Sequence, residues 1–169
     1  MQPVIRVQCA LVVVAFACYI AYRRSVVRAW VGPSGYGYST PASEIAAPFD
    51  LTGSHFLVTG ANSGLGYETA RVLASRGADV TLAARTVAKA EAAIASISEA
   101  VGVSAGNLKA LECDLSSLRS VDAAAEHFVS WSLPLDGLIL NAGIMALPAR
   151  AETEDGIEKQ APPARGASA

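Results

Sequence analysis

The chain has 169 residues, of which 52% are hydrophobic and 17% are charged, and its formal net charge is -2 at pH 7. This length suits one domain of ordinary size, and the high apolar share indicates a membrane segment, a buried parallel sheet, or both. The charge excludes nucleic acid binding through a strongly basic surface, and the cysteines at positions 9, 18 and 113 lack the spacing of a metal site.

An apolar run occupies the N-terminus from Val4 to Tyr22, and only Arg6 and Gln8 interrupt it. Its length is close to the ~20 residues that a helix needs to cross a bilayer. Three arginines follow directly, and the positive-inside rule places such a cluster on the cytoplasmic side. We therefore predict a membrane anchor over residues 1–24, in the endoplasmic reticulum or another endomembrane, with the following domain facing the cytosol.

Two other interpretations of this run stay open. The sequence Ala15-Phe16-Ala17 has the small-x-small form of a signal-peptide cleavage site, and a soluble apolar helix is the third possibility. The basic cluster favours the anchor, because the charges of a signal peptide precede its apolar core instead of following it.

Residues 25–50 are rich in glycine, proline and serine and carry alternating tyrosines without helical or strand periodicity, which is typical of a linker. Over residues 51–147, short apolar runs then alternate with stretches of helical spacing. The expected strands are 56–58, 79–84, 108–113 and 135–140, and the expected helices are 64–76, 87–101 and 118–129.

The apolar strand runs do not alternate with polar residues, which indicates strands covered on both faces. The order β-α-β-α-β-α-β predicts an α/β fold: a Rossmann-type doubly wound parallel sheet of about four strands, behind an N-terminal transmembrane helix. The residues expected on the inner face of the first helix are Leu65, Ala70, Val72 and Leu73. Those expected on the inner face of the third helix are Leu118, Val121, Ala125, Phe128 and Val129.

A glycine-rich loop, Thr59-Gly60-Ala61-Asn62-Ser63-Gly64-Leu65-Gly66, joins the first expected strand to the first expected helix. Gly60 would allow a tight turn, Gly64 would let backbone N–H groups approach a pyrophosphate, and Gly66 would let the helix pack closely on the strand. The helix N-terminus would offer free N–H donors and a positive dipole end to phosphates. A glycine turn without a ligand is the alternative, which the flanking strand and helix make weaker.

The second expected strand ends with Ala84 and Arg85, where a dinucleotide site that prefers NAD has an acidic residue for the ribose 2′-OH. A guanidinium can instead hold a 2′-phosphate through two hydrogen bonds. Arg85 therefore favours NADP(H) over NAD(H), with a surface arginine that starts the next helix as the alternative. The missing acid also speaks against a SAM-dependent methyltransferase.

Several motifs occur together with the glycine-rich loop and in a fixed order. They are Ala83-Ala84-Arg85 with Lys89, Cys113-Asp114-Leu115-Ser116-Ser117-Leu118, Leu140-Asn141-Ala142-Gly143 and Thr153-Glu154-Asp155-Gly156-Ile157-Glu158. From about Asp50 to Glu158 the chain resembles the short-chain dehydrogenase/reductase family, in particular its retinol dehydrogenase branch and the oxidoreductase domain found behind WW domains.

The resemblance implies roles for further residues. Asp114 would bond the adenine amino group with Leu115 beside it, Asn141 would stabilise the central sheet, and Ala142 and Gly143 would line the adenosine ribose. From the residues alone, Asp114 is equally well part of the cap region before the third helix, and Asn141 could be only a turn residue at a strand end.

The resemblance also implies an NAD(P)-dependent oxidoreductase that acts on a lipophilic alcohol or carbonyl compound, as retinol dehydrogenases do, with a catalytic Tyr and a Lys four residues later. None of the five tyrosines has Lys at that spacing, and the tail formed by residues 148–169 departs from the family at about residue 160. We therefore expect a chain truncated before its catalytic residues, with weak NADP(H) binding and no turnover. The alternatives are a catalytically inactive, membrane-tethered nucleotide-binding or interaction module and a non-functional product.

Overall fold

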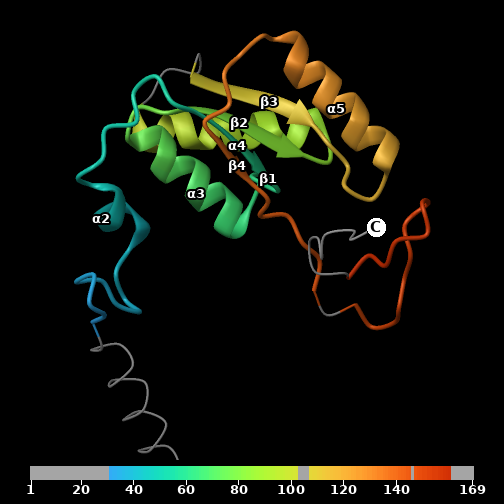
Figure 1. The fold of residues 1–169 in the computed structure, drawn as a ribbon, viewed down its shortest axis with the longest axis horizontal. Coiled ribbons are helices and arrows are strands. Elements are labelled where there is room, and N and C mark those ends of the chain that lie inside the picture. The colour runs from blue at the N-terminus through green and yellow to red at the C-terminus, as the bar shows by residue number, and fades with distance from the viewer. Residues whose placement is uncertain (1–30, 103–106, 146, 161–169) are drawn as a thin grey trace, which may run out of the picture. The chain divides into compact units, whose positions relative to one another are not determined.

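The computed structural model describes residues 31–102, 107–145 and 147–160. They contain a parallel sheet of four strands in the order β3-β2-β1-β4, which confirms the predicted Rossmann-type architecture (Figure 1). The strands are β1 (His55–Thr59), β2 (Asp79–Ala84), β3 (Leu108–Glu112) and β4 (Gly137–Ile139). The helices are α2 (Ala42–Ala46), α3 (Gly64–Ser75), α4 (Val87–Val101) and α5 (Leu118–Ser130).

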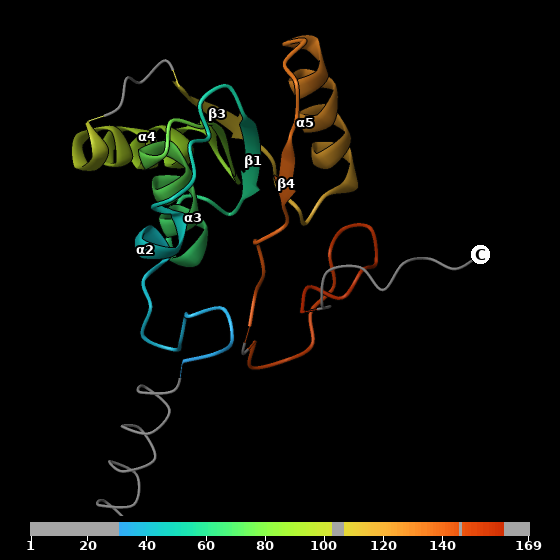
Figure 2. The same ribbon diagram turned by 60° about the vertical axis from the view of Figure 1, so that its left-hand side comes forward.

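The helices cover both faces of the sheet, as predicted for a doubly wound fold. Figure 2 shows α3 and α4 together on one face and α5 on the other. The core under α3 and α4 contains Val58, Val80, Leu82 and Ile97. Alternate residues of the same strands form the smaller core under α5, which contains Leu57, Ala83, Leu111, Ala124 and Phe128.

The two central strands are buried on both faces, but the outer strands are not. All residues of β2 after Asp79 are buried, whereas in β3 only Leu108 and Leu111 are buried, and no residue of β4 is fully buried. The prediction that all four strands are covered on both faces is therefore right for β1 and β2 and wrong for β3 and β4. The difference arises because β3 and β4 form the two edges of the described sheet.

Two predicted helix faces need correction. Leu65 is 81% exposed because the first turn of α3 extends past the carboxyl edge of the sheet. On α5 the predicted face is rotated, with Leu118 51% and Val129 72% exposed, because the helix packs on the sheet through Ala124 and Phe128.

The fourth strand is shorter than the predicted run from residue 135 to 140. At its start, the Asp136 carboxylate accepts a bond of 2.8 Å from His55 N–H, and Asp136 N–H donates to the His55 carbonyl at 2.9 Å. At its end, Asn141 N–H turns to the Thr59 hydroxyl at 3.1 Å instead of continuing the ladder. Polar side chains thus terminate β4 at both of its ends.

The described chain divides into two compact units after Ile45. In the first unit, Gly32 N–H bonds the Tyr36 carbonyl at 2.8 Å, and Val31 forms an antiparallel bridge with Gly37. The segment predicted as a linker also contains the unpredicted short helix α2, which starts where the Pro41 carbonyl accepts Glu44 N–H at 3.0 Å. The predicted membrane anchor lies outside the described residues, and within the described part no helix has the length and apolarity to cross a membrane.

Candidate functional site

A groove of about 660 Å³ lies at the carboxyl ends of the parallel strands. In doubly wound sheets ligands bind in this crevice, where the direction of the crossovers reverses. Here the reversal lies between β1 and β4, since β2 and β3 extend the sheet on the other side of β1. The predicted site residues that line the groove are Gly60, Asn62, Ser63, Leu65, Arg85, Asp114, Leu115, Asn141, Ala142 and Gly143. Gly64 and Gly66 do not line it.

The glycine-rich loop needs glycine at specific positions. Gly60 has φ +65° and Gly64 has φ +58°, in the left-handed region that side chains disfavour. A Cβ on Gly66 would lie 2.5 Å from the Gly60 carbonyl oxygen and 2.5 Å from Asn141 Nδ2, closer than atoms can approach. The start of α3 therefore packs directly on the end of β1, as predicted for the third glycine.

The start of α3 presents backbone donors without a side-chain cap. Ser63 precedes the helix in an extended conformation, and its side chain makes no capping hydrogen bond. The first N–H groups of any helix lack partners within the helix, and they carry the positive end of its dipole. Since Ser63 and Leu65 line the groove, this end of α3 borders it and suits an anionic group.

Thr59 organises the junction between β1 and β4, a role that the sequence did not reveal. Its hydroxyl oxygen accepts N–H bonds of 3.1 Å from both Asn141 and Ala142. The Asn141 amide Nδ2 returns a bond of 3.1 Å to the Thr59 carbonyl. Asn141 is thus more than a turn residue, because it ties the end of β4 to the end of β1 beside Gly66.

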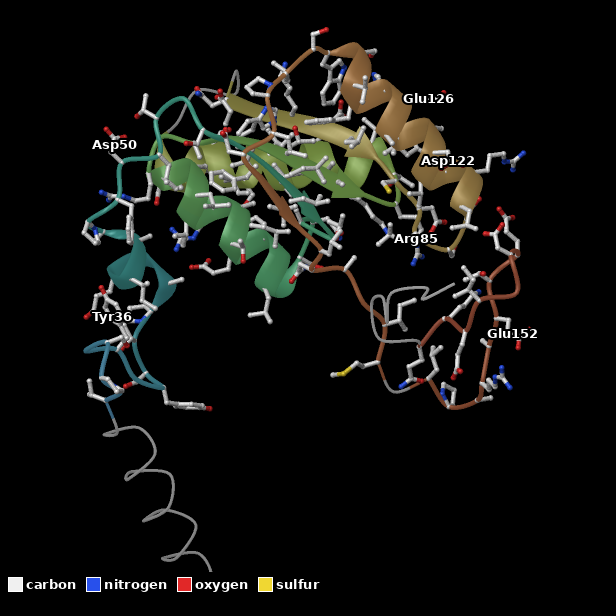
Figure 3. The ribbon with its side chains drawn as sticks, viewed as in Figure 1. Tyr36, Asp50, Arg85, Asp122, Glu126 and Glu152 are labelled. Carbon is white, nitrogen blue, oxygen red and sulfur yellow. The ribbon has the colours of Figure 1, made fainter. Side chains whose placement is uncertain are left out.

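Arg85 and Asp114 lie at the ends of neighbouring strands. Arg85 follows β2 and is labelled at the carboxyl end of the sheet in Figure 3, and its Nε is 3.8 Å from Asp114 Oδ1. The Arg85 side chain is 61% exposed, so it is available to a ligand. Lys89, in the first turn of α4, also lines the groove. No acidic residue follows β2 directly, and the local cations favour a negatively charged group.

Asp114 belongs to a tight turn and is not the cap of α5. Its Oδ1 accepts bonds of 3.0 Å from Ser116 N–H and 2.7 Å from the Ser116 hydroxyl, while Ser117 is the residue that precedes the helix. These two bonds lower the pKa of Asp114, and the positive charges of Arg85 and Lys159 lower it further. The carboxylate is therefore ionised at neutral pH and can accept hydrogen bonds from a ligand.

Several lining residues were not predicted. Cys113 lies in the groove at the end of β3, and burial, followed by the nearby Asp114 charge, raises the pKa of its thiol, so it stays protonated at neutral pH. Thr59, Ala84, Lys89, Ser116 and Ile144 also line it, and the segment after Ile144 adds Thr153, Ile157, Glu158 and Lys159. No periodic pattern marks this segment as a wall of the groove, although residues 153–158 resemble the family.

Comparisons with known proteins agree with this geometry. The family described as short chain dehydrogenase matches residues 54–160. The chain belongs to the short-chain dehydrogenase family. It is 51% identical over 98 residues to the short-chain dehydrogenase/reductase bet4 of Neocamarosporium betae, covering 58% of this chain and 28% of that protein. It is 44% identical over 123 residues to the human WW domain-containing oxidoreductase, covering 73% of this chain and 29% of that protein.

A solved structure has a similar fold to this chain. The N-domain of a bacterial malonyl-CoA reductase, determined with NADP, superposes with a TM-score of 0.54 at 30% identity, covering 57% of this chain and 18% of that one. The chain spans only about a third or less of the length of the curated relatives above, at 28% and 29%. The match therefore concerns the part of the family that carries the glycine-rich loop and the first four strands.

Proposed function

We propose that this groove binds NADP(H), and that the chain supplies the nucleotide-binding part of an oxidoreductase. The observation that carries the proposal is the close approach at the carboxyl end of β1. A Cβ on Gly66 would lie only 2.5 Å from the Gly60 carbonyl oxygen, so the backbone of α3 lies very close to the end of β1. This close approach brings the uncapped start of α3 to the groove. A pyrophosphate there would accept backbone N–H bonds from the loop that contains Gly60, Asn62, Ser63, Gly64 and Leu65.

The preference for NADP(H) rests on the charges that border the end of β2. Arg85 can form two parallel hydrogen bonds with a 2′-phosphate, and Lys89 adds a second positive charge on the same side of the groove. An acidic residue, which would repel that phosphate, is absent from the end of β2. The malonyl-CoA reductase domain that shares this fold was determined with NADP, which supports the same choice.

The rest of the nucleotide would extend along the strand ends. Asp114, which lies just after β3 and lines the groove, would accept a bond from the adenine amino group, with Leu115 beside it. Asn141, Ala142 and Gly143 at the end of β4 would border the adenosine ribose. The bonds between Thr59 and both Asn141 and Ala142 hold this edge in place before any ligand arrives.

The proposed reaction is hydride transfer between the nicotinamide and a lipophilic alcohol or carbonyl compound, as in retinol dehydrogenases. A membrane anchor at residues 1–24 would place the domain beside a substrate dissolved in the bilayer.

Binding of NADPH and NADH to the detergent-purified chain tests the cofactor proposal. Arg85→Ala should weaken NADPH binding about tenfold, because a charge-assisted pair is lost, and should leave NADH binding unchanged. Arg119→Ala, which removes an exposed arginine of α5 outside the groove, should change neither affinity. Equal losses for the two cofactors in Arg85→Ala, or tighter binding of NADH by the unmodified chain, would contradict the preference.

A further inference from the structure

A short hairpin, Ala151–Lys159, forms one wall of the groove. Its two arms meet in an antiparallel bridge between Glu152 and Glu158, and Lys159 N–H bonds the Ala151 carbonyl at 2.9 Å. The Thr153 hydroxyl accepts Ile157 N–H at 3.1 Å, which closes the turn. The hairpin carries four of the groove-lining residues, so its position determines the width of the groove on this side.

The hairpin lies against the adenine side of the proposed nucleotide site. The positive charges of Arg85 and Lys159 both lower the pKa of the Asp114 carboxyl group. All three residues line the groove. Ile157 adds an apolar contact surface that is 45% exposed. A planar base bonded to Asp114 would therefore lie between the turn after β3 and the hairpin.

One side chain connects the hairpin to the rest of the domain at the start of α5. Asp155 Oδ2 accepts a bond of 2.8 Å from the backbone N–H of Leu118, the first residue of α5, across 37 positions of sequence. Ser117, directly before the helix, makes no capping bond with its own side chain. A carboxylate at a helix N-terminus accepts a free N–H and interacts favourably with the helix dipole, so Asp155 supplies the missing cap.

We propose that Asp155 is a positioning residue for the nucleotide: by capping α5, it holds the hairpin as the wall of the groove. Asp155 does not itself line the groove. Its effect on affinity therefore arises only through the hairpin. When the cap is lost, binding must also order the hairpin, and this cost makes the net binding free energy less favourable. This inference rests on the proposed NADP(H) site and identifies a residue that controls its affinity.

The connection acts in both directions. If the hairpin must be docked for tight binding, then a bound nucleotide must in turn stabilise the docked hairpin by the same factor. NADPH should therefore slow hydrogen exchange of the Leu118 amide, although that amide bonds Asp155 and not the ligand.

The test compares three variants of the full chain in NADPH titrations, with hydrogen exchange of the Leu118 amide measured in parallel. Asp155→Ala removes the acceptor and should weaken NADPH binding about fivefold, which corresponds to the loss of one helix cap. Asp155→Asn keeps an acceptor oxygen and should bind within about twofold of the unmodified chain. The control Glu154→Ala removes a carboxylate from the same turn and should also stay within about twofold.

The results separate this inference from the proposed function. If the unmodified chain does not bind NADPH, the proposed function is wrong and the role of Asp155 with it. If the unmodified chain binds NADPH and Asp155→Ala binds equally well, only the positioning role is wrong, even if Leu118 exchanges faster. Equal losses in Asp155→Asn or Glu154→Ala would also overturn the role, because they would indicate an effect of charge and not of the cap.

Discussion

The two ends of the parallel sheet are built in different ways. At the carboxyl ends, the chain uses glycines, backbone amides and exposed charged side chains around an open groove. At the amino ends, larger side chains fill the space: His55 is only 3% exposed, bonds Thr81 Oγ1 through Nε2 at 2.8 Å, and packs edge-on against Phe128 at 5.6 Å. The comparison teaches that one end is shaped for a ligand and the other for stability.

The amino end also fixes α5 to the sheet. Phe128 contacts the Trp131 ring at 5.7 Å between centroids, and Lys109 lies over the same tryptophan at 5.7 Å. Aromatic pairs of this edge-on geometry add to the stabilisation that burial provides. Changes at this end should therefore alter the free energy of unfolding without altering the affinity for a nucleotide.

Two glycine substitutions give the largest expected contrast. Gly66→Ala places a Cβ 2.5 Å from Asn141 Nδ2, and Gly137→Ala places one 2.5 Å from the Phe56 ring. Each should lower the free energy of unfolding by about 2 kcal/mol through overpacking. Only Gly66→Ala should also weaken NADPH binding, by more than tenfold, because it separates α3 from the end of β1.

Urea denaturation and NADPH titration of both variants check this contrast. Gly143→Ala is the matched control for the urea denaturation alone, because Gly143 lines the groove. A Cβ there meets no atom within 4 Å, so its free energy of unfolding should stay within about 0.5 kcal/mol of the unmodified chain. Similar losses of affinity in the Gly66 and Gly137 variants would show that the two ends are not independent.

A smaller effect on the free energy of unfolding should follow from the titration of His55 at the amino ends of the strands. Burial is the main cause that lowers the pKa of His55, and Lys109 lowers it too, against the opposing charges of Asp79 and Asp136. As the pH falls, the His55 imidazole therefore takes up its proton in the unfolded chain before it does so in the folded chain. The contribution of neutral His55 to the free energy of unfolding is fully present above about pH 6.5. Below that pH the free energy of unfolding falls by at most about 1.4 kcal/mol per pH unit.

Urea denaturation at several pH values measures this slope. His55→Gln removes the titrating group, and between pH 7 and 5 its stability should change less with pH than that of the unmodified chain, as linkage requires. An identical slope in the variant would assign the pH dependence to other groups. Stability that rises as the pH falls through this window would contradict the direction of the shift.

The sequence predicted the central part of this structure well. The bounds of β2 and α4 agree with the predicted 79–84 and 87–101, because apolar runs and alanine-rich helical spacing specify both elements locally. The positions of the glycine-rich loop and of Arg85 follow from the same local order.

The parts that sequence reasoning missed depend on contacts between distant residues. The rotation of α5 is determined by Phe128 packing on His55, which lies far away in the chain. The early end of β4 depends on Thr59, and the docking of the hairpin depends on the bond between Asp155 and Leu118. No periodicity along the chain reports such pairs, so only the folded structure shows them.

The most direct test of the central claim is to map NADPH onto the two ends of the sheet by amide chemical shifts of the isotope-labelled chain in a mild detergent. We predict that shifts concentrate in the glycine-rich loop, at Arg85, around Asp114 and at residues 141–143, while the amides near His55 and Phe128 stay unchanged. Absence of shifts at saturating NADPH, or shifts centred on the amino end, would contradict the claim that the carboxyl-end groove is a nucleotide site.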